Sequence, residues 1–416
     1  MFDLRLSAEQ LEFRDTVRDF VKNEVKPAAL HPSRLEPFEK PLLGELLDYA
    51  SRMGLRTLSL SEAAGGAGAD TLTSCIVLEE LAAGDVDIAM SIALTQGLAR
   101  ALFESGASDA QRSALLPAFM DDHRYHLALA ANAAHADRGW HYHREYSDDA
   151  PPAATAARQA NGDWLLNGSF AFVANAPIAK LLIVQAKDDA GGTCITVLVP
   201  AGTPGLEATD ATAAFGGETA GGRTLARWHH GAGGAVRLTN CRVPAANVLS
   251  ADGAAAFSDA AYAMRADAHV AAVNLGLGRA AYEAAVDYAK IRVQGGRPIV
   301  QHQSIGGILA DIAIKLELAR NAIWKAAWAA DNPEAAAEGA SVALPLHTIA
   351  RTYTAEAMHE ATLGAAECFG AMGVMRDMPL QKYVHDAFVF LNGCGHDSAT
   401  KLEVAEALAG YEREYV

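Results

Sequence analysis

Cysteine is scarce in this sequence, with five residues among 416 and no two of them in a CxxC pair. This spacing excludes a zinc ribbon and a thioredoxin-type motif, because both need closely spaced thiols. An odd number of scattered cysteines is more typical of reduced thiols in the cytoplasm than of a disulfide framework. The five are Cys75, Cys194, Cys241, Cys368 and Cys394.

Basic residues are also few relative to acidic ones. The chain has 34 Lys and Arg against 50 Asp and Glu, so its formal net charge is −16. Nucleic acid and anionic membrane surfaces repel such a charge, and we expect neither as a main partner. No uninterrupted apolar run reaches the ~18 residues of a membrane span. The amphipathic, acid-bearing start resembles neither a signal peptide nor a transit peptide, so the expected location is the cytoplasm.

The sequence does have a large apolar fraction, arranged in three differently patterned regions. It is 51% hydrophobic and 20% charged, which indicates a sizeable core, and its length suggests two or three domains of roughly 150 residues. Helical periodicity dominates residues 1–124, short β-rich runs occupy 125–250, and long apolar-striped helices follow over 251–416. The prediction is an α+β multidomain protein with an N-terminal helical domain, an antiparallel β domain and a C-terminal helical bundle.

The predicted elements can be placed along the chain. The first helix, Ser7–Val25, begins at a capping box formed by Ser7 and Gln10. Two long loops, Asp137–Gln159 and Ala211–Gly234, interrupt the β domain, and loops of that length are often functional. The other predicted helices are Leu42–Gly54, Thr71–Ala83, 85–104, Asp109–Phe119, Asp259–Gln294, Gln303–Ala330, Pro345–Gly370 and Asp397–Glu412, and the predicted strands are Trp164–Ala171, Lys180–Ala186, Thr193–Pro200 and Ala235–Val243.

Six segments, in order and on the expected element types, resemble the acyl-CoA dehydrogenase family. The resemblance covers nearly the whole chain. It implies an N-terminal helical domain, a β-barrel-like middle domain and a C-terminal four-helix bundle, assembled as a homotetramer that is a dimer of dimers. The segments are Gly54–Leu60, Ser61–Asp70, Val77–Ser91, Asn161–Ala176, Leu238–Ser250 and Arg292–Ile305.

The resemblance also implies FAD as cofactor, an acyl-CoA as substrate and an electron-transfer flavoprotein as partner. In the family, the flavin accepts a hydride from an acyl thioester while a carboxylate removes the α-proton. Arg292 and Gln303 match family positions that reach FAD bound mainly by a neighbouring subunit, and an arginine fork suits pyrophosphate oxygens. Gly370 and Gly373 match a turn near the adenosine half, although a plain helix-breaking turn would have the same residues.

Other family positions carry different residues here. The flavin-stacking tryptophan aligns with Phe172, which can still stack or can be an ordinary core residue. The flavin-bonding threonine aligns with Ala174, which keeps only its backbone amide for that role. The flavin cradle falls on Ala128–Asp137 and lacks the family's hydroxyl and Gly-Ser pair. The catalytic glutamate is replaced by Cys394, whose thiol would need a lowered pKa to act as a base, and the family's second base position falls on Ala266.

Nearby carboxylates offer alternatives. Asp267 follows Ala266, but on a helix it points about 100° away. Asp85 and Asp87 begin a helix near the expected acyl pocket, where helix capping is the simpler role. Glu367 is expected to be structural or to face the adenosine. No metal is predicted, because no standard site has the spacing of His135, His141, His143, His229 and His230.

Three functions remain open on this evidence. The first is an FAD-dependent dehydrogenase that oxidises an acyl-CoA with a non-standard base, in fatty acid metabolism. The second is a catalytically degenerate subunit of a hetero-oligomeric dehydrogenase, because residues that serve a neighbour's FAD are retained while the chain's own positions are altered. The third is a flavin monooxygenase on the same fold, suggested by the segment His396–Lys401. The first is the favoured hypothesis, although fold alone does not establish function.

Overall fold

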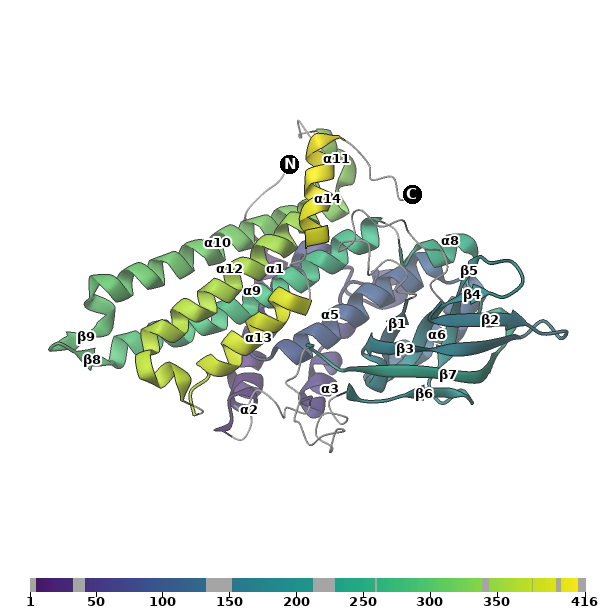
Figure 1. Ribbon diagram of the computed structural model, residues 1–416, viewed down its shortest axis with the longest axis horizontal. Helices are drawn as coiled ribbons and strands as arrows, with labels where there is room; N and C mark the ends of the chain where they lie inside the picture. Colours follow the sequence, from purple (N-terminus) through teal and green to yellow (C-terminus); the bar gives the residue numbers. More distant parts are fainter. Residues whose placement is uncertain are drawn as a thin grey trace.

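The computed structural model describes residues 5–32, 42–131, 152–211, 229–258, 260–338, 344–375, 377–393 and 398–410. A helical body occupies one end of the elongated molecule and a curled sheet the other (Figure 1). The two helical regions of the sequence form a single core: buried side chains of the first 100 residues and of the last 170 pack in one cluster. The sheet has a cluster of its own, and a third cluster joins sheet residues such as Leu127 and Ile183 to helical residues such as Leu98 and Phe119.

The N-terminal helices begin where capping residues predict. Ser7 and Gln10 form the expected reciprocal capping box at the start of α1 (Ala8–Phe20). Asp70 caps α4 (Thr71–Ala82) and Asp85 caps α5 (Val86–Arg100), in each case by accepting bonds from first-turn amides. The other elements here are α2 (Lys26–Ala29), α3 (Gly44–Arg52) and α6 (Asp109–Asp121), with π-helical turns at Val21–Val25 and Ala101–Gly106.

Helix α5 lies at the centre of the molecule, between the sheet and the helical body (Figure 1). With its π-helical extension to Gly106, it is the one stretch of the described chain that is long and apolar enough to cross a membrane. However, 78% of its most apolar window is buried inside the protein. This burial is what a core helix of a folded domain requires.

The sheet differs from the predicted antiparallel one in the pairing of β4. Its order is β1-β4-β2-β3-β7-β6, with β5 also paired to β4. Strand β4 runs parallel to β1 and to β2, whereas the pairs β2–β3, β3–β7, β4–β5 and β6–β7 are antiparallel. The strands are β1 (His126–Ala130), β2 (Ala154–Arg158), β3 (Trp164–Ala174), β4 (Ala179–Asp188), β5 (Cys194–Pro200), β6 (Leu206–Ala208) and β7 (Gly233–Val243).

Three strands of this sheet were not predicted. Strands β1 and β6 fall outside the predicted runs, and β2 lies within the segment Asp137–Gln159 that we expected to be a loop. Strand β2 is rich in alanine, so it lacks the β-branched signal on which the prediction relied. The rest of that segment up to residue 151, and residues 212–228 of the second predicted loop, lie outside the described residues.

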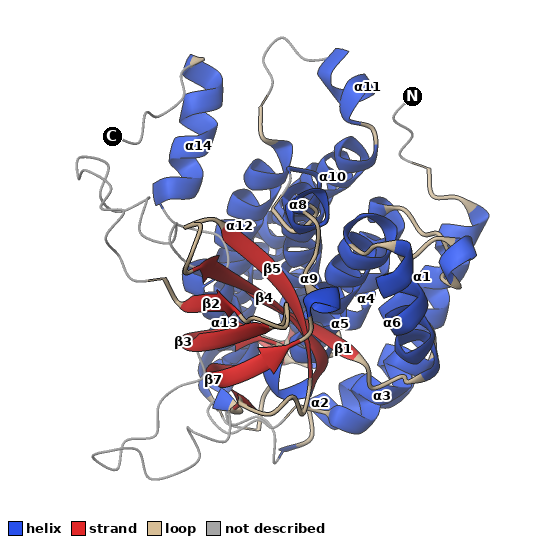
Figure 2. Cartoon of the chain, turned by 90° about the vertical axis from the view of Figure 1, so that its right-hand side faces the viewer, coloured by secondary structure: helices blue, strands red, loops and turns tan. Residues whose placement is uncertain are grey.

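The C-terminal region is dominated by long helices that pack side by side (Figures 1 and 2). Helices α9 (Ala260–Ile291), α10 (Gln303–Asp331) and α12 (Leu346–Phe369) match the predicted ranges closely, and α13 (Leu380–Gly393) joins them. A small hairpin of β8 (Val293–Gln294) and β9 (Arg297–Pro298) connects α9 to α10. Shorter helices are α8 (Ala251–Ala255), α11 (Pro333–Glu338) and α14 (Ser398–Ala409).

A buried charge network ties four helices together. Arg279 of α9 forms two 2.7 Å bonds to the carboxylate of Glu80 on α4. Arg18 of α1 adds a 2.6 Å bond to Glu80, and Arg320 of α10 donates to Glu79 at 2.8 Å. Burial alone would raise the pKa of Glu80, but hydrogen bonds from Arg279 and Arg18 outweigh it and lower that pKa. The network therefore fixes α4, the neighbour of α5 in the sequence, against the bundle.

Candidate functional site

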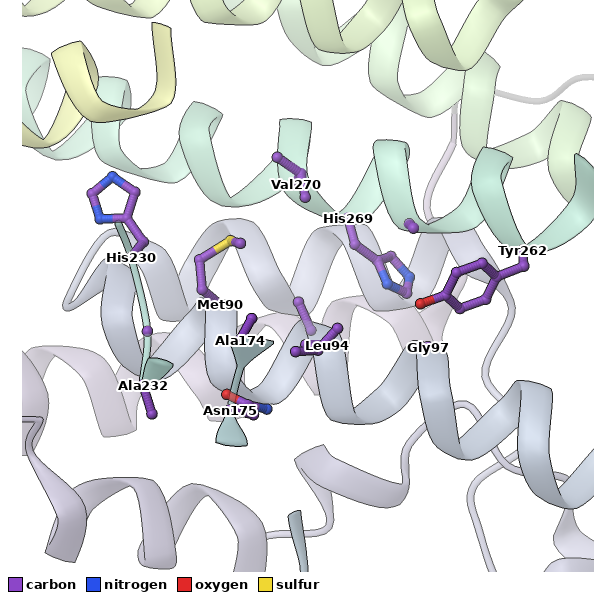
Figure 3. A pocket seen from close by; sticks show the side chains of 13 residues that line it. Met90, Leu94, Gly97, Ala174, Asn175, His230, Ala232, Tyr262, His269 and Val270 are labelled. Carbon is purple, nitrogen blue, oxygen red and sulfur yellow. The ribbon is translucent and has the colours of Figure 1, made fainter. Parts of the chain in front are cut away.

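A largely apolar pocket lies between α5 and α9 (Figure 3). The end of β3 and the segment that leads into β7 close its third side. Its empty space is about 500 Å³ when the solvent at the mouth is included. The residues that line it are Met90, Ala93, Leu94, Gly97, Ala174, Asn175, His230, Gly231, Ala232, Tyr262, Ala266, His269 and Val270.

One face of α9 supplies a wall of the pocket. Tyr262, Ala266 and His269 follow each other at spacings of four and three residues, and Val270 comes four residues after Ala266, which places all four on one side of a helix. The resemblance to the family predicted that Ala266 occupies the position of the base in a second group of members. Ala266 does line the pocket. It offers a methyl group where a carboxylate would be needed to remove a proton.

Two polar side chains of this face differ in burial, since Tyr262 is half-buried and His269 is fully buried. His269 is 4% exposed, and neither of its ring nitrogens has a hydrogen-bond partner. Burial lowers the pKa of His269 to about 3, with help from the positive charges of Arg100 and Arg265. Burial also raises the pKa of Tyr262 to about 12. Both side chains are therefore neutral at neutral pH.

His230 lies at the other end of the pocket (Figure 3), where it meets a cluster of buried charged side chains. The His230 Nε2 lies 2.9 Å from the backbone carbonyl of Asp386, so this nitrogen donates a proton to it. The Nδ1 lies 3.6 Å from a carboxylate oxygen of Asp87, which also accepts a bond from the amide of Gly231. The ring packs against Phe390 of α13. Lys382 completes the cluster, 2.6 Å from the carboxylate of Asp386.

Phe172 and Ala174, the predicted flavin contacts of the β domain, lie at the pocket end of β3. Ala174 lines the pocket. The ring of Phe172 is half-buried, packs against His229 and crosses over Gly233 of β7. A Cβ at Gly233 would lie 2.3 Å from that ring, so only glycine leaves room for Phe172 in this position.

The other predicted cofactor residues lie elsewhere in the chain. Arg292 and Gln303 are exposed and flank the β8–β9 hairpin, at the end of the molecule opposite the sheet (Figure 1). Gly370 ends α12 with a positive φ of 57°, and Gly373 is buried with its Cα facing the carbonyl of Ala366. Within one chain, the residues of the hairpin and those of the pocket are not brought together.

Asp85 and Asp267, two of the alternative carboxylates, have structural partners. Asp85 caps α5, as expected. Asp267 points away from the pocket and pairs with Arg351 of α12 at 2.7 Å. Glu367 is exposed on α12. Cys394 lies outside the described residues, and so does most of the cradle segment that follows Ala131.

The described residues contain no group of three or more histidine, cysteine or acidic side chains that could hold a metal ion. His135, His141 and His143 lie in the part of the chain that is not described. His229 and His230, the other two members of that set, contact Phe172 and Phe390 respectively.

Comparison with known proteins identifies the family. Sequence models of the acyl-CoA dehydrogenase N-terminal domain and C-terminal domain match residues 7–122 and 252–409. The chain belongs to the acyl-CoA dehydrogenase family. A probable acyl-CoA dehydrogenase, YngJ of Bacillus subtilis (strain 168), is 28% identical over 98% of this chain and 99% of its own length.

Solved structures of the acyl-CoA dehydrogenase family confirm the predicted fold. Butyryl-CoA dehydrogenase from Megasphaera elsdenii superimposes with a TM-score of 0.79 at 24% identity, covering 98% of this chain and all 100% of that one. The prolyl acyl carrier protein oxidase AnaB gives a TM-score of 0.76 at 21% identity, covering 97% of this chain and 100% of that one. At these identities, the likeness shows the fold alone.

Sequence reasoning missed the polar residues of the pocket. Tyr262 and His269 were not singled out, although two polar side chains on an otherwise apolar helix face are a visible signal. His230 was considered only as a member of a metal cluster. Its contact with Asp386 joins residues 156 positions apart, and nothing in the local pattern of either segment indicates it.

Proposed function

We propose that this member of the acyl-CoA dehydrogenase family is an FAD-dependent oxidoreductase that acts on an acyl-CoA thioester. The pocket between α5 and α9 is the observation that carries the proposal. It is largely apolar and lies between two helices, and its polar lining residues are Asn175, His230, Tyr262 and His269. Such a site suits a hydrocarbon chain held in a fixed orientation.

The described residues fit a flavin dinucleotide shared between two chains. Phe172 offers a half-buried aromatic ring beside the pocket, which suits stacking on a flat ring system. Arg292 and Gln303 are exposed at the β8–β9 hairpin, where a guanidinium suits pyrophosphate oxygens. Because the hairpin and the pocket are far apart in one chain, the proposal requires the hairpin of a second copy, and therefore a dimer or a tetramer.

A bound FAD would accept the hydride equivalent from the acyl chain, and the protein would supply position and a base. Of the described residues that line the pocket, His230, Tyr262 and His269 are titratable. The low pKa of His269 and the high pKa of Tyr262 leave neither able to accept a proton near neutral pH. The two nitrogens of His230 face Asp386 and Asp87.

The base is therefore proposed to come from the segment that follows α13. Cys394 remains the predicted residue, because it occupies the family's glutamate position. An electron-transferring flavoprotein is the proposed electron acceptor and the cytoplasm the proposed location, both on the family relationship and the sequence.

A second candidate is a partner subunit that completes the flavin site of a related, catalytically competent chain. The specific observation in its favour is that Ala174 and Ala266 present methyl groups to the pocket where the family uses a hydroxyl and, in some members, a carboxylate. This chain would then contribute chiefly the Arg292 hairpin.

The visible absorption spectrum of the purified protein, before and after addition of FAD, tests the proposal. We expect a flavin spectrum with roughly one FAD per chain, bleached by a suitable acyl-CoA without oxygen, and a much slower bleaching in Cys394→Ala. Failure to bind FAD even in excess would overturn the enzyme proposal and favour the partner subunit. Oxygen consumption by the reduced flavin would favour the monooxygenase instead.

A further inference from the structure

His269 is a buried polar side chain without a partner, and it lies in the wall of the pocket. It is 4% exposed, and both ring nitrogens lack a hydrogen bond. The backbone of Ala93 lies near the His269 ring and raises its pKa slightly, against the effect of burial. It does not form a hydrogen bond of normal geometry with either ring nitrogen. Buried polar groups are nearly always paired, so an unpaired imidazole beside a cavity indicates a partner that the cavity receives.

The imidazole is placed to meet a molecule in the pocket. In Figure 3, its ring lies beside Leu94 and the hydroxyl of Tyr262 points toward it, whereas His230 lies at the opposite end. Besides Tyr262 and His269, the residues of α5 and α9 that line the pocket are apolar or glycine: Met90, Ala93, Leu94, Gly97, Ala266 and Val270. A ligand that fills this part of the pocket with hydrocarbon alone would leave both imidazole nitrogens unpaired.

The charge state of His269 defines the kind of partner. Because burial holds its pKa near 3, the ring is neutral and carries one donor and one acceptor. Two positive charges, those of Arg100 and Arg265, act on His269. Both of these side chains already have partners, and Arg100 pairs with Asp331 at 3.3 Å. A carboxylate on the ligand would therefore be buried without a free counter-charge, which is strongly unfavourable.

We propose that the pocket selects an acyl thioester whose chain carries a neutral hydrogen-bonding group, such as a hydroxyl or a carbonyl, which pairs with His269. This inference rests on the proposed function, because it names the substrate class of the same site. It makes His269 a specificity-determining residue, and the plain saturated acyl chain a poorer ligand.

Calorimetric binding to the FAD-loaded protein tests the inference without relying on turnover. The probes are saturated straight-chain acyl-CoAs of increasing length, each compared with its ω-hydroxy and ω-carboxy counterparts. At the best chain length, we expect the hydroxylated thioester to bind about tenfold more tightly than the saturated one. The carboxylated thioester should bind more weakly than either.

Variants of His269 separate pairing from volume. His269→Phe should abolish the preference for the hydroxyl, whereas His269→Gln, which keeps a donor and an acceptor, should retain part of it. Val270→Ala, which enlarges the same wall without changing its polarity, should alter both affinities alike. If His269→Phe does not fold, His269→Gln and the comparison of saturated with hydroxylated thioesters in the wild-type protein still test the inference.

Two results would overturn the inference in distinguishable ways. Equal binding of saturated and hydroxylated thioesters by the wild-type protein would mean that an ordered water satisfies His269; the proposed function would then stand and the inference would fall. Absence of binding by every thioester, despite bound FAD, would remove the proposed function and the inference with it.

Discussion

At the scale of single residues, buried histidines make the protein sensitive to mild acid. His126 is 2% exposed and bonds Thr95 at 3.0 Å, and burial lowers its pKa to about 3. Its unfolded-state pKa is the ordinary 6.5. Below that pH the unfolded chain takes up a proton that the folded protein does not, so stability falls as the pH drops from 6.5 toward 3.

The prediction is that His126→Asn loses part of this acid sensitivity. At pH 5 the unequal protonation of one such histidine costs about 2 kcal/mol of unfolding free energy. Urea unfolding at pH 7 and pH 5 measures it: the wild type should lose more stability between the two than His126→Asn does. His31→Asn, at an exposed position, is the matched control. Equal losses in wild type and His126→Asn would contradict the assignment.

Gly233 controls the position of Phe172. An added Cβ would approach the Phe172 ring to 2.3 Å, so Gly233→Ala must displace the ring. We expect a loss of about 1–3 kcal/mol in stability and weaker binding of FAD, measured by thermal unfolding and by flavin titration. Gly307→Ala on α10, where no atom lies within 4 Å, is the control and should be slightly stabilising. Unchanged FAD affinity in Gly233→Ala would remove Phe172 from the proposed flavin site.

The pocket also shows which parts of the site could be predicted from the sequence. Ala174 and Ala266 were predicted to lie at the site because they belong to linear motifs of the family, and both line the pocket. The unpaired state of His269 and the contact of His230 with Asp386 could not be predicted, since each depends on elements distant in the sequence. The roles of Cys394, Arg292, Gln303, Gly370 and Gly373 stay predictions from the sequence.

At the scale of elements, the buried charges of α4 connect four helices. Replacing Arg279 by methionine would leave Glu80 with one exposed arginine, Arg18, as partner, and Glu79 with Arg320. Breaking a buried pair from one side is expected to cost about 3–5 kcal/mol. Chemical denaturation measures this, and Lys401→Met, which breaks an exposed 2.7 Å pair with Glu356, is the control expected to cost less than about 1 kcal/mol.

The double variant Arg279→Met with Glu80→Leu tests the reason for that cost. If the loss comes from an uncompensated buried charge, removal of both partners should restore much of the stability. The lowered pKa of Glu80 adds a pH dependence: its contribution is present above its ordinary value of 4.5 and disappears as the pH falls below it. A double variant no better than the single one would contradict this explanation.

The long helices were the most predictable elements, because an apolar stripe over many turns is unambiguous. Helix α13 was not predicted, and the strands β1, β2 and β6, which were also missed, are short. The parallel pairing of β4 with β1 and β2 was missed because it joins strands that are not consecutive in the chain, and the local pattern of a strand does not reveal its partners.

At the scale of the whole molecule, the exposed apolar residues indicate a surface that another chain covers. Ile291 and Val293 are 78% and 55% exposed, and they flank Arg292 at the β8–β9 hairpin. Large apolar side chains gathered at an exposed tip favour an interface. Other exposed apolar residues of the bundle are Ile314, Leu318, Leu363, Val374, Met375 and Phe388.

If a second copy supplies the hairpin, two defective chains should complement each other. Arg292→Ala alone should weaken FAD binding about tenfold to a hundredfold, and Ala174→Phe should block the pocket end of β3. Co-expressed in equal amounts and mixed at random, they should regain roughly one intact site in four, because each mixed pair combines an intact pocket with an intact Arg292. Flavin content per chain measures this. Mixed oligomers that bind no more FAD than either variant alone would show that Arg292 does not act across the interface, since every chain in them would then carry its own defect.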